Sequence, residues 1–176
     1  TKLKYKIQEI PNLAKQQLIS KYGKSLVIAD ISIDILPSNI NEYIIENNCG
    51  SLLLINLGIT NLEGLEEIKN LNDLKLGNLP LLENLEGLEK LDNLNALYLY
   101  NLPLIKNLEG IENIKNLNEL HLEYLPLEIL EGIEKLENLN KLLLSNLSKI
   151  KNLELLEKIK NLNTFKLWNL SKLKNL

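Results

Sequence analysis

Residues 74–96 read LKLGNLPLLENLEGLEKLDNLNA and residues 97–119 read LYLYNLPLIKNLEGIENIKNLNE, so two successive stretches of the chain repeat one pattern. Each repeat opens with the phrase Leu-x-Leu-x-(Asn/Tyr)-Leu. The phrase starts at intervals of 23, 23, 22 and 23 residues, at Leu74, Leu97, Leu120, Leu142 and Phe165. This period and phrase are typical of a solenoid, in which similar coils stack along one axis. Such a stack presents one broad surface, whereas enzymes usually need an enclosed pocket.

Each coil contains two segments with different hydrophobic periods. Leu97 and Leu99 alternate with Tyr98 and Tyr100, which predicts a short strand whose leucines face the core and whose tyrosines face outward. In the return segment the leucines recur every three residues, at positions 85, 88, 91 and 94, which favours a 3₁₀ turn or a very short helix. A Glu-Gly pair marks the start of most of these return segments, at residues 63–64, 86–87, 109–110 and 131–132.

The chain is expected to divide into an N-terminal cap, residues 1–25, and a solenoid, residues 26–176. Within the cap, the alternation over residues 2–8 predicts a strand, and Pro11 and Gly23 bracket a predicted helix. The solenoid has about seven coils, of which the first is degenerate. The sequence ends in the middle of a repeat, so its C-terminal end is predicted to be truncated.

The first coil is long enough to hold a real helix. Ser38 is expected to cap it, with Ile40, Tyr43 and Ile44 facing inward, before residues 47–50 turn the chain.

Composition narrows the range of partners and compartments. The formal charge is −3, and acidic and basic residues are interleaved, so nucleic acid is not an expected partner. No stretch approaches the roughly 18 apolar residues of a membrane span, so membrane insertion is not expected. Cys49 is the only cysteine, which excludes an intrachain disulfide. A reducing compartment such as the cytoplasm is therefore expected, with a bacterial cell surface as the alternative.

The repeats resemble the leucine-rich repeat superfamily over roughly residues 49–176, and more faintly from residue 26. The Leu-Glu-Gly-(Leu/Ile)-Glu segment is similar to short repeats of the type 1 protein phosphatase regulatory subunit class and of bacterial internalins. The Asn-Leu-Pro phrase at residues 78–80 and 101–103 is also similar to plant disease-resistance receptors. This resemblance implies an α/β fold: a curved parallel sheet on the concave face, with 3₁₀ or short helical segments on the convex face.

One position departs from the family pattern. The family usually places an inward asparagine three residues after the second strand leucine, where this chain holds leucine at positions 57, 79, 102, 125, 147 and 170. The amides fall one residue earlier, at positions 56, 78, 101, 146 and 169. Either these asparagines are exposed, or the coil has slipped by one residue.

Only outward strand positions can carry specificity without disturbing the leucine core. Aromatic residues gather there beside the only histidine, which is a composition that binding interfaces enrich. We therefore expect a protein partner to bind a set of seven outward residues: Tyr98, Tyr100, His121, Glu123, Tyr124, Lys166 and Trp168. The alternative is that some rings simply pack flat against neighbouring strands. Replacing Tyr98 and Trp168 by alanine is expected to remove binding with little change in melting temperature.

No catalytic, metal or cofactor site is expected. Glu119, His121 and Glu123 alternate on one strand, but residues two apart are about 6.8 Å apart, too far to converge on one ion. These three polar side chains are expected to be exposed to solvent without a specific role. Cys49 precedes Gly50 in an expected turn, with no histidine nearby in the sequence, which disfavours a catalytic thiol.

The sequence thus predicts a non-catalytic protein-binding module, with three alternatives for its wider role. The resemblance to the phosphatase regulatory class implies a regulatory scaffold, and the resemblance to internalins implies a bacterial surface adhesin. The third is the ligand-sensing fragment of a larger receptor or enzyme.

Overall fold

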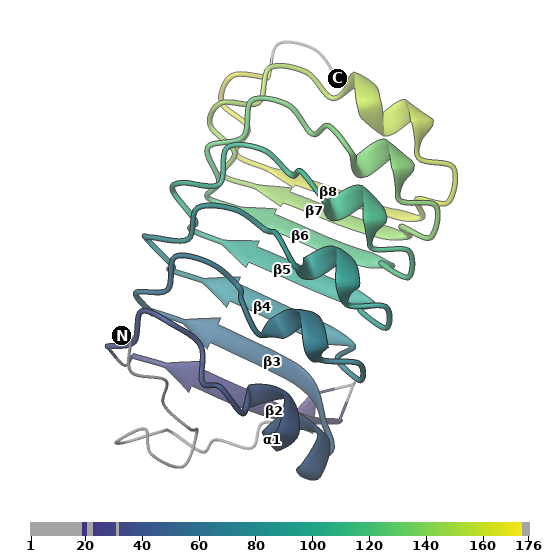
Figure 1. Ribbon diagram of the computed structural model, residues 1–176. Coiled ribbons are helices and arrows are strands. Elements are labelled where there is room, and N and C mark those ends of the chain that lie inside the picture. Colours follow the sequence, from purple (N-terminus) through teal and green to yellow (C-terminus); the bar gives the residue numbers. More distant parts are fainter. Residues whose placement is uncertain (1–18, 21–22, 31, 174–176) are drawn as a thin grey trace.

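All strands of the described residues lie in one sheet, in the order in which the chain forms them. The structure is a computed structural model that describes residues 19–20, 23–30 and 32–173. Its strands are β1 (Ile19–Ser20), β2 (Gly23–Ala29), β3 (Cys49–Ile55), β4 (Asp73–Gly77), β5 (Ala96–Tyr100), β6 (Glu119–Glu123), β7 (Lys141–Ser145) and β8 (Thr164–Trp168). Strand β1 pairs antiparallel with β2, and β2 to β8 are parallel. Figure 1 shows the coils stacked along one axis.

Equivalent residues of successive coils lie opposite one another in this sheet. Leu52 is opposite Leu74, and Leu74 is opposite Leu97, with the same register continuing through Phe165 of β8. Leu26 lies opposite Leu52, which confirms that the degenerate first phrase is a true coil. The register repeats because a one-residue slip would turn every inward leucine to the outer face.

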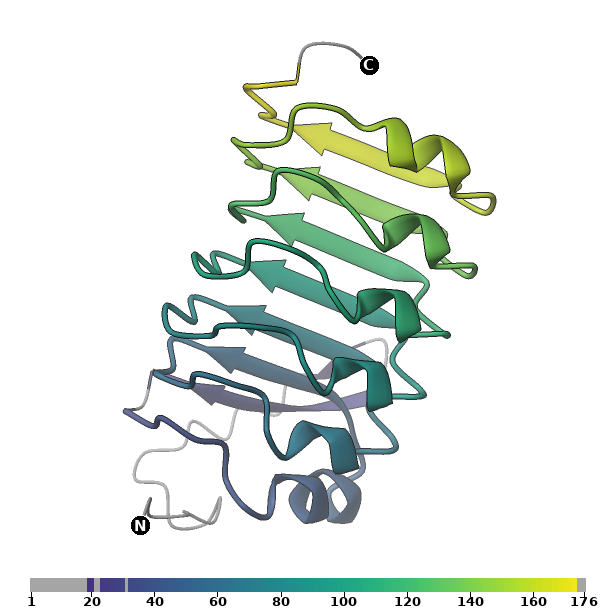
Figure 2. The ribbon, with the colours of Figure 1, turned by 45° about the horizontal axis from the view of Figure 1, so that its top comes forward.

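The return segments are short 3₁₀ helices on the other side of the coils, as predicted (Figure 2). They are η2 (Leu65–Glu67), η3 (Leu88–Lys90), η4 (Ile111–Asn113), η5 (Ile133–Lys135) and η6 (Glu154–Lys158). Four of them are entered through a left-handed glycine, for example Gly87 with φ 98°, whose N–H donates to the Glu89 carboxylate at 2.8 Å. This explains the repeated Glu-Gly pair: glycine adopts that φ without a steric cost. The single α-helix among the described residues, α1 (Ile40–Glu46), occupies this side in the first coil.

The core is one continuous column of inward leucines and isoleucines. Leu97 and Leu99 are 0% and 1% exposed, and the equivalent leucines of the neighbouring coils are equally buried. The inward residues of β8 are the exception. Phe165 is 39% exposed and Leu167 is half-buried, because no further coil in the described residues covers β8.

Three local predictions near the N-terminus are wrong. Residues 19–20 form strand β1, where the sequence predicted the end of a helix, and residues 23–25 belong to β2. Residues 1–18 and 21–22 of the predicted cap lie outside the described residues. Helix α1 is capped at Asn39 instead of Ser38, although Ile40 and Ile44 are buried as expected and Tyr43 packs against the core. Residues 49–50 begin β3 and are not part of the turn. The division between cap and solenoid at residue 25 stays a prediction.

The asparagines that follow the strands take left-handed backbone angles, with φ between 50° and 55°. The leucine that comes next is buried in each coil from 57 to 147. Register is kept, since the backbone N–H of Asn78, for example, still donates to the carbonyl of Tyr100. The first alternative is therefore correct: the amides lie outside the core. Asparagine suits this place because it tolerates the left-handed region better than most residues.

Candidate protein-binding face

The side chains that β3 to β8 point away from the core form the strand face, which carries three rows of residues. The first row, at the start of each strand, consists of Ser51, Asp73, Ala96, Glu119, Lys141 and Thr164. The register aligns a middle row, Leu53, Lys75, Tyr98, His121, Leu143 and Lys166, and an end row, Ile55, Gly77, Tyr100, Glu123, Ser145 and Trp168. All seven predicted binding residues lie on this face or, for Tyr124, directly after β6. They do not form one cluster, and their surroundings differ.

A buried carboxylate organises the centre of the middle row. Glu119, the first residue of β6, is only 5% exposed. Its Oε1 accepts a hydrogen bond from the Tyr98 hydroxyl at 2.9 Å, and it lies 2.7 Å from His121 Nε2 and 2.7 Å from Lys141 Nζ. These groups come from three neighbouring strands. A carboxylate can stay charged at this depth because cationic and hydrogen-bonding partners surround it.

Tyr98 is held in this cluster from both sides. Its ring lies 4.3 Å from the His121 ring, measured between centroids, and Lys75 Nζ lies 4.7 Å from its centroid on the other side. For Tyr98 the packing alternative therefore holds, because the side chain is half-buried and its hydroxyl is bound to Glu119. Replacing it would disturb the fold as well as binding, so Tyr98→Ala is a poor test of the face.

The burial of His121 favours the neutral form of its imidazole. Burial lowers its pKa below the ordinary 6.5, and this effect outweighs the hydrogen bond and the charge of Glu119, which raise it. Lys141 and Lys75 lower the pKa further. The imidazole therefore serves the face at neutral pH as an uncharged hydrogen-bonding group.

The end row carries the more accessible aromatic residues. Tyr100 is 41% exposed and Tyr124 51% exposed, and their rings meet edge to face with centroids 5.8 Å apart. Gly77 lies beside Tyr100, and a Cβ at Gly77 would meet the tyrosine ring at an ordinary contact distance of 3.5 Å. These two rings combine exposure with a fixed mutual geometry, as an interface anchor requires.

The remaining predicted residues lie toward β8. Trp168 is 50% exposed, and Lys166 Nζ lies 6.0 Å from its ring centroid. Glu123 is half-buried and accepts a hydrogen bond from Asn146 Nδ2 at 3.3 Å. The structure thus separates a polar centre, an exposed tyrosine pair and an exposed tryptophan.

Sequence reasoning missed two residues at the beginning of strands. Asp73 and Glu119 are both buried, at 2% and 5% exposure, whereas Glu119 was expected to be exposed to solvent. Asp73 accepts a hydrogen bond from the Ser51 hydroxyl at 3.0 Å and lies 3.8 Å from Lys75 Nζ. The residue just before the first leucine of each strand could have revealed this pair. At that position the coils carry two carboxylates, together with serine, alanine, lysine and threonine.

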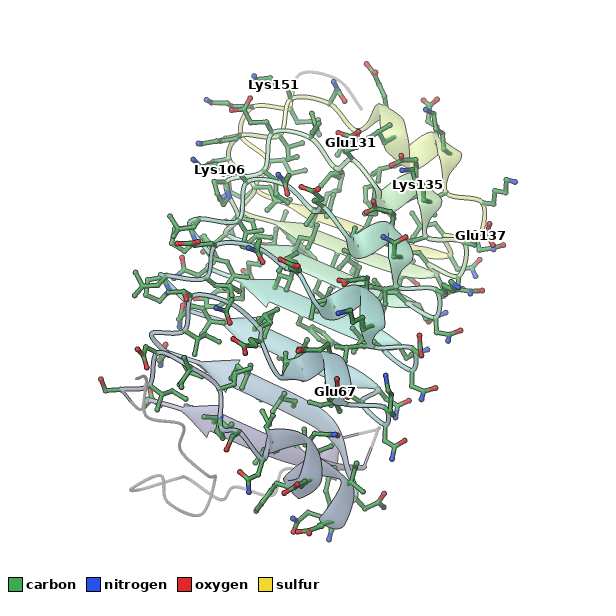
Figure 3. All side chains as sticks on the ribbon, in the orientation of Figure 1. Glu67, Lys106, Glu131, Lys135, Glu137 and Lys151 are labelled. Atoms are coloured by element: carbon green, nitrogen blue, oxygen red, sulfur yellow. The ribbon has the colours of Figure 1, made fainter. Side chains whose placement is uncertain are left out.

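Other chemistry finds little support in the described part of the chain. No group of three His, Cys, Asp or Glu residues there is arranged to hold a metal ion. Cys49 is buried, and burial raises the pKa of its thiol although the nearby Lys24 lowers it. The raised pKa opposes thiolate formation. A hollow of about 760 Å³ lies on the side of the short helices and is lined mainly by glutamates and asparagines. Figure 3 shows charged side chains such as Glu67, Glu131 and Lys135 on that side.

Comparison with known proteins agrees with this architecture. A leucine-rich repeat protein of Leptospira interrogans matches with a TM-score of 0.61 at 24% identity, covering 86% of this chain and 47% of its own. The chain has a leucine-rich repeat fold. Internalin C2 of Listeria monocytogenes matches this fold with a TM-score of 0.57 at 21% identity over 87% of this chain and 76% of its own. Internalin F of the same organism matches with a TM-score of 0.56 at 20% identity over 86% and 49%.

The leucine-rich repeat chain spans about half the length of two of these three proteins. No protein-family model matches its sequence, and comparison with curated proteins gives no match either. Among the described residues, no helix has both the length and the apolar composition needed to cross a bilayer.

Proposed function

We propose that this leucine-rich repeat chain is a non-catalytic module that binds a protein partner through its strand face. The observation that carries the proposal is the separation of roles within each strand. Inward positions are filled by buried aliphatic residues, while outward positions differ from coil to coil and hold the exposed Tyr100 and Trp168. Exposed aromatics on a rigid sheet are features that protein interfaces enrich.

The size of the face favours moderate affinity. Five spacings separate β3 to β8, and at ~4.8 Å each they give the face a length of ~24 Å. With a width of ~10–15 Å, the face is smaller than the ~800 Å² that each partner contributes to a standard interface. Tight binding would need contacts from the loops beside the strands.

The proposal is tested by affinity capture with the strand face altered. The variant Tyr100→Ser/Trp168→Ser removes two exposed rings, and Glu67→Gln/Lys135→Gln is the matched control on the side of the short helices (Figure 3). A partner that binds the face is lost with the first variant and retained with the control, while urea unfolding midpoints stay within error. Retention of every partner by the first variant would refute the proposal.

A regulatory scaffold in the cytoplasm is the role we propose for such a module. A bacterial surface adhesin is the second candidate, favoured by the similarity in fold to two internalins. A ligand-sensing fragment of a larger receptor would use the same face. Labelling of intact cells with a membrane-impermeant reagent separates the first two roles, because only a surface protein is modified.

A further inference from the structure

The exposed apolar residues of the protein gather along one edge of the sheet. Eight large hydrophobic residues are clearly exposed among the described residues: Ile45, Leu81, Tyr100, Leu104, Tyr124, Ile129, Phe165 and Trp168. All except Ile45 and Phe165 lie where a strand ends or in the loop that follows it. We call the part of this region formed by residues 55–61, 77–82, 100–105 and 123–127 the strand-end edge.

This edge is almost free of charge. Its four segments read INLGITN, GNLPLL, YNLPLI and EYLPL and contain one charged residue, Glu123, although 24% of the whole chain is charged. Glu123 is itself hydrogen-bonded to Asn146 of the next coil. Exposed apolar residues with few charges among them mark a candidate interaction site.

Tyr124 adds an independent observation, since its backbone is unfavourable for its side chain. The residue that follows each strand from β2 to β8 has φ between 50° and 56°, and in the other six coils it is asparagine or aspartate. Tyr124 has φ 51° and is 51% exposed. A bulky residue in the left-handed region is uncommon, and such residues cluster at functional sites. Here the side chain completes the edge-to-face pair with Tyr100.

The edge is also rigid before it binds anything. Pro80, Pro103 and Pro126 occupy the same place in three successive coils. The side chain of Asn101 donates to Asn78 across the coils at 2.8 Å. Fixed rings, fixed backbone and ordered amides reduce the entropy lost on binding.

We propose that the strand-end edge is where the strand face engages its partner, and that the partner contributes an uncharged, apolar stretch of polypeptide. The inference rests on the proposed function and specifies the chemistry of the partner. A charged partner group would lose its hydration against the Tyr100 and Tyr124 rings, while the edge segments hold no lysine or arginine and their one carboxylate, Glu123, is already hydrogen-bonded. An apolar segment buries these rings, and its backbone can hydrogen-bond with the asparagine amides and tyrosine hydroxyls.

A polypeptide fits this edge better than a lipid surface. Peripheral membrane binding relies on lysine and arginine facing anionic headgroups. The charged neighbours of the edge are mostly acidic, namely Glu83, Glu123 and Glu128, against Lys106. The formal charge of the whole chain is −3. Contact with an anionic bilayer would therefore be opposed by charge.

The test uses a library of random twelve-residue peptides displayed on phage and selected on the wild-type protein. The edge variant is Tyr100→Ser/Tyr124→Asn, in which asparagine restores the residue found at this place in most coils. The matched control, Glu67→Gln/Lys135→Gln, lies on the side of the short helices, and a third variant, Leu143→Ser/Lys166→Gln, alters the middle row of the strand face. Urea unfolding midpoints verify that all three variants fold.

The inference expects enriched peptides that are apolar and uncharged. Their synthetic copies should bind the edge variant at least tenfold more weakly than wild type, and the control within about twofold. Enrichment of charged peptides, or equal binding to the edge variant, would overturn it. Peptides sensitive only to the middle-row variant overturn the inference but leave the proposed function standing. Insensitivity to both the edge variant and the middle-row variant, or no enrichment, counts against both the inference and the proposed function. If the wild type but not the edge variant sediments with phosphatidylcholine–phosphatidylserine vesicles, the edge binds a membrane. That result would overturn the inference of an apolar polypeptide partner.

Discussion

Replacing Glu119 by glutamine should destabilise the protein, because one carboxylate oxygen serves three donors. Hydrogen bonds to a charged acceptor contribute about 1.5–3 kcal/mol and neutral ones about 0.5–1.5 kcal/mol, so the bonds from Tyr98 and His121 each weaken by about 1 kcal/mol. Lys141 is 35% exposed and can turn to water, which limits its share to at most about 1 kcal/mol. Because a neutral amide is easier to bury, part of this loss is offset, and we expect a net loss of about 1–3 kcal/mol.

The same substitution should move the pKa of His121 in a specified direction. The hydrogen bond and the charge of Glu119 are the two effects that raise this pKa against burial. Glu119→Gln weakens the first and removes the second, so the pKa of His121 should fall further below 6.5. His121 is the only histidine in the chain, so its ring proton resonances in an NMR titration need no assignment.

Glu123→Gln is the matched control for both measurements. Glu123 lies on the same strand but is more exposed, with longer hydrogen bonds of 3.4 Å and 3.3 Å to Ser145 and Asn146. Its substitution should leave the urea midpoint within about 0.5 kcal/mol of wild type. If Glu119→Gln behaves like this control, or raises the pKa of His121, then Glu119 does not organise the middle row.

Three further predictions concern pH, the core and the turns. The pKa of His121 is lower in the folded protein than in the unfolded chain, so stability should decline as pH falls from about 7 to about 5. His121→Gln should remove this part of the pH dependence when urea midpoints are measured across that range. Leu99→Ala should lower the free energy of unfolding by about 3 kcal/mol, whereas Leu167→Ala in the partly exposed last strand should lower it by about 1 kcal/mol. Equal losses in chemical denaturation would contradict the stacked core. Gly110→Ala should lower the free energy of unfolding by about 1 kcal/mol, because the φ of Gly110 is 91°. Gly77→Ala should not lower it, because the new methyl group would meet Tyr100 at an ordinary 3.5 Å. Thermal unfolding distinguishes the two variants.

The sequence was sufficient for the architecture because the inward positions repeat with little variation. The spacing of Leu74, Leu97 and Leu120 predicts parallel strands in register, and the three-residue spacing from Leu85 predicts the 3₁₀ segments. The N-terminal region was harder because its pattern occurs only once. Residues 19–20 pair with β2 through backbone hydrogen bonds, and local side-chain preference does not reveal such pairing.

The site could be predicted only at the level of faces. Strand alternation places Tyr98 and Tyr100 on the same side correctly, yet it does not distinguish a clamped ring from an exposed one. That difference depends on neighbours 21 to 24 residues away: Glu119 and His121 around Tyr98, and Tyr124 beside Tyr100. The burial of Glu119 was likewise invisible, because a strand-initial glutamate is exposed in most contexts and only the adjoining coils enclose it.

The uniform register of the sheet has a genetic consequence. Removing residues 97–119 would join Ala96 directly to Leu120, and Ala96 would take the place of Glu119 while every later coil kept its alignment. Unequal recombination between repeats could therefore shorten or lengthen the protein by whole units and rearrange its outer residues without redesigning the interior. A lineage carrying this gene could change what it recognises in single steps, each leaving a foldable product.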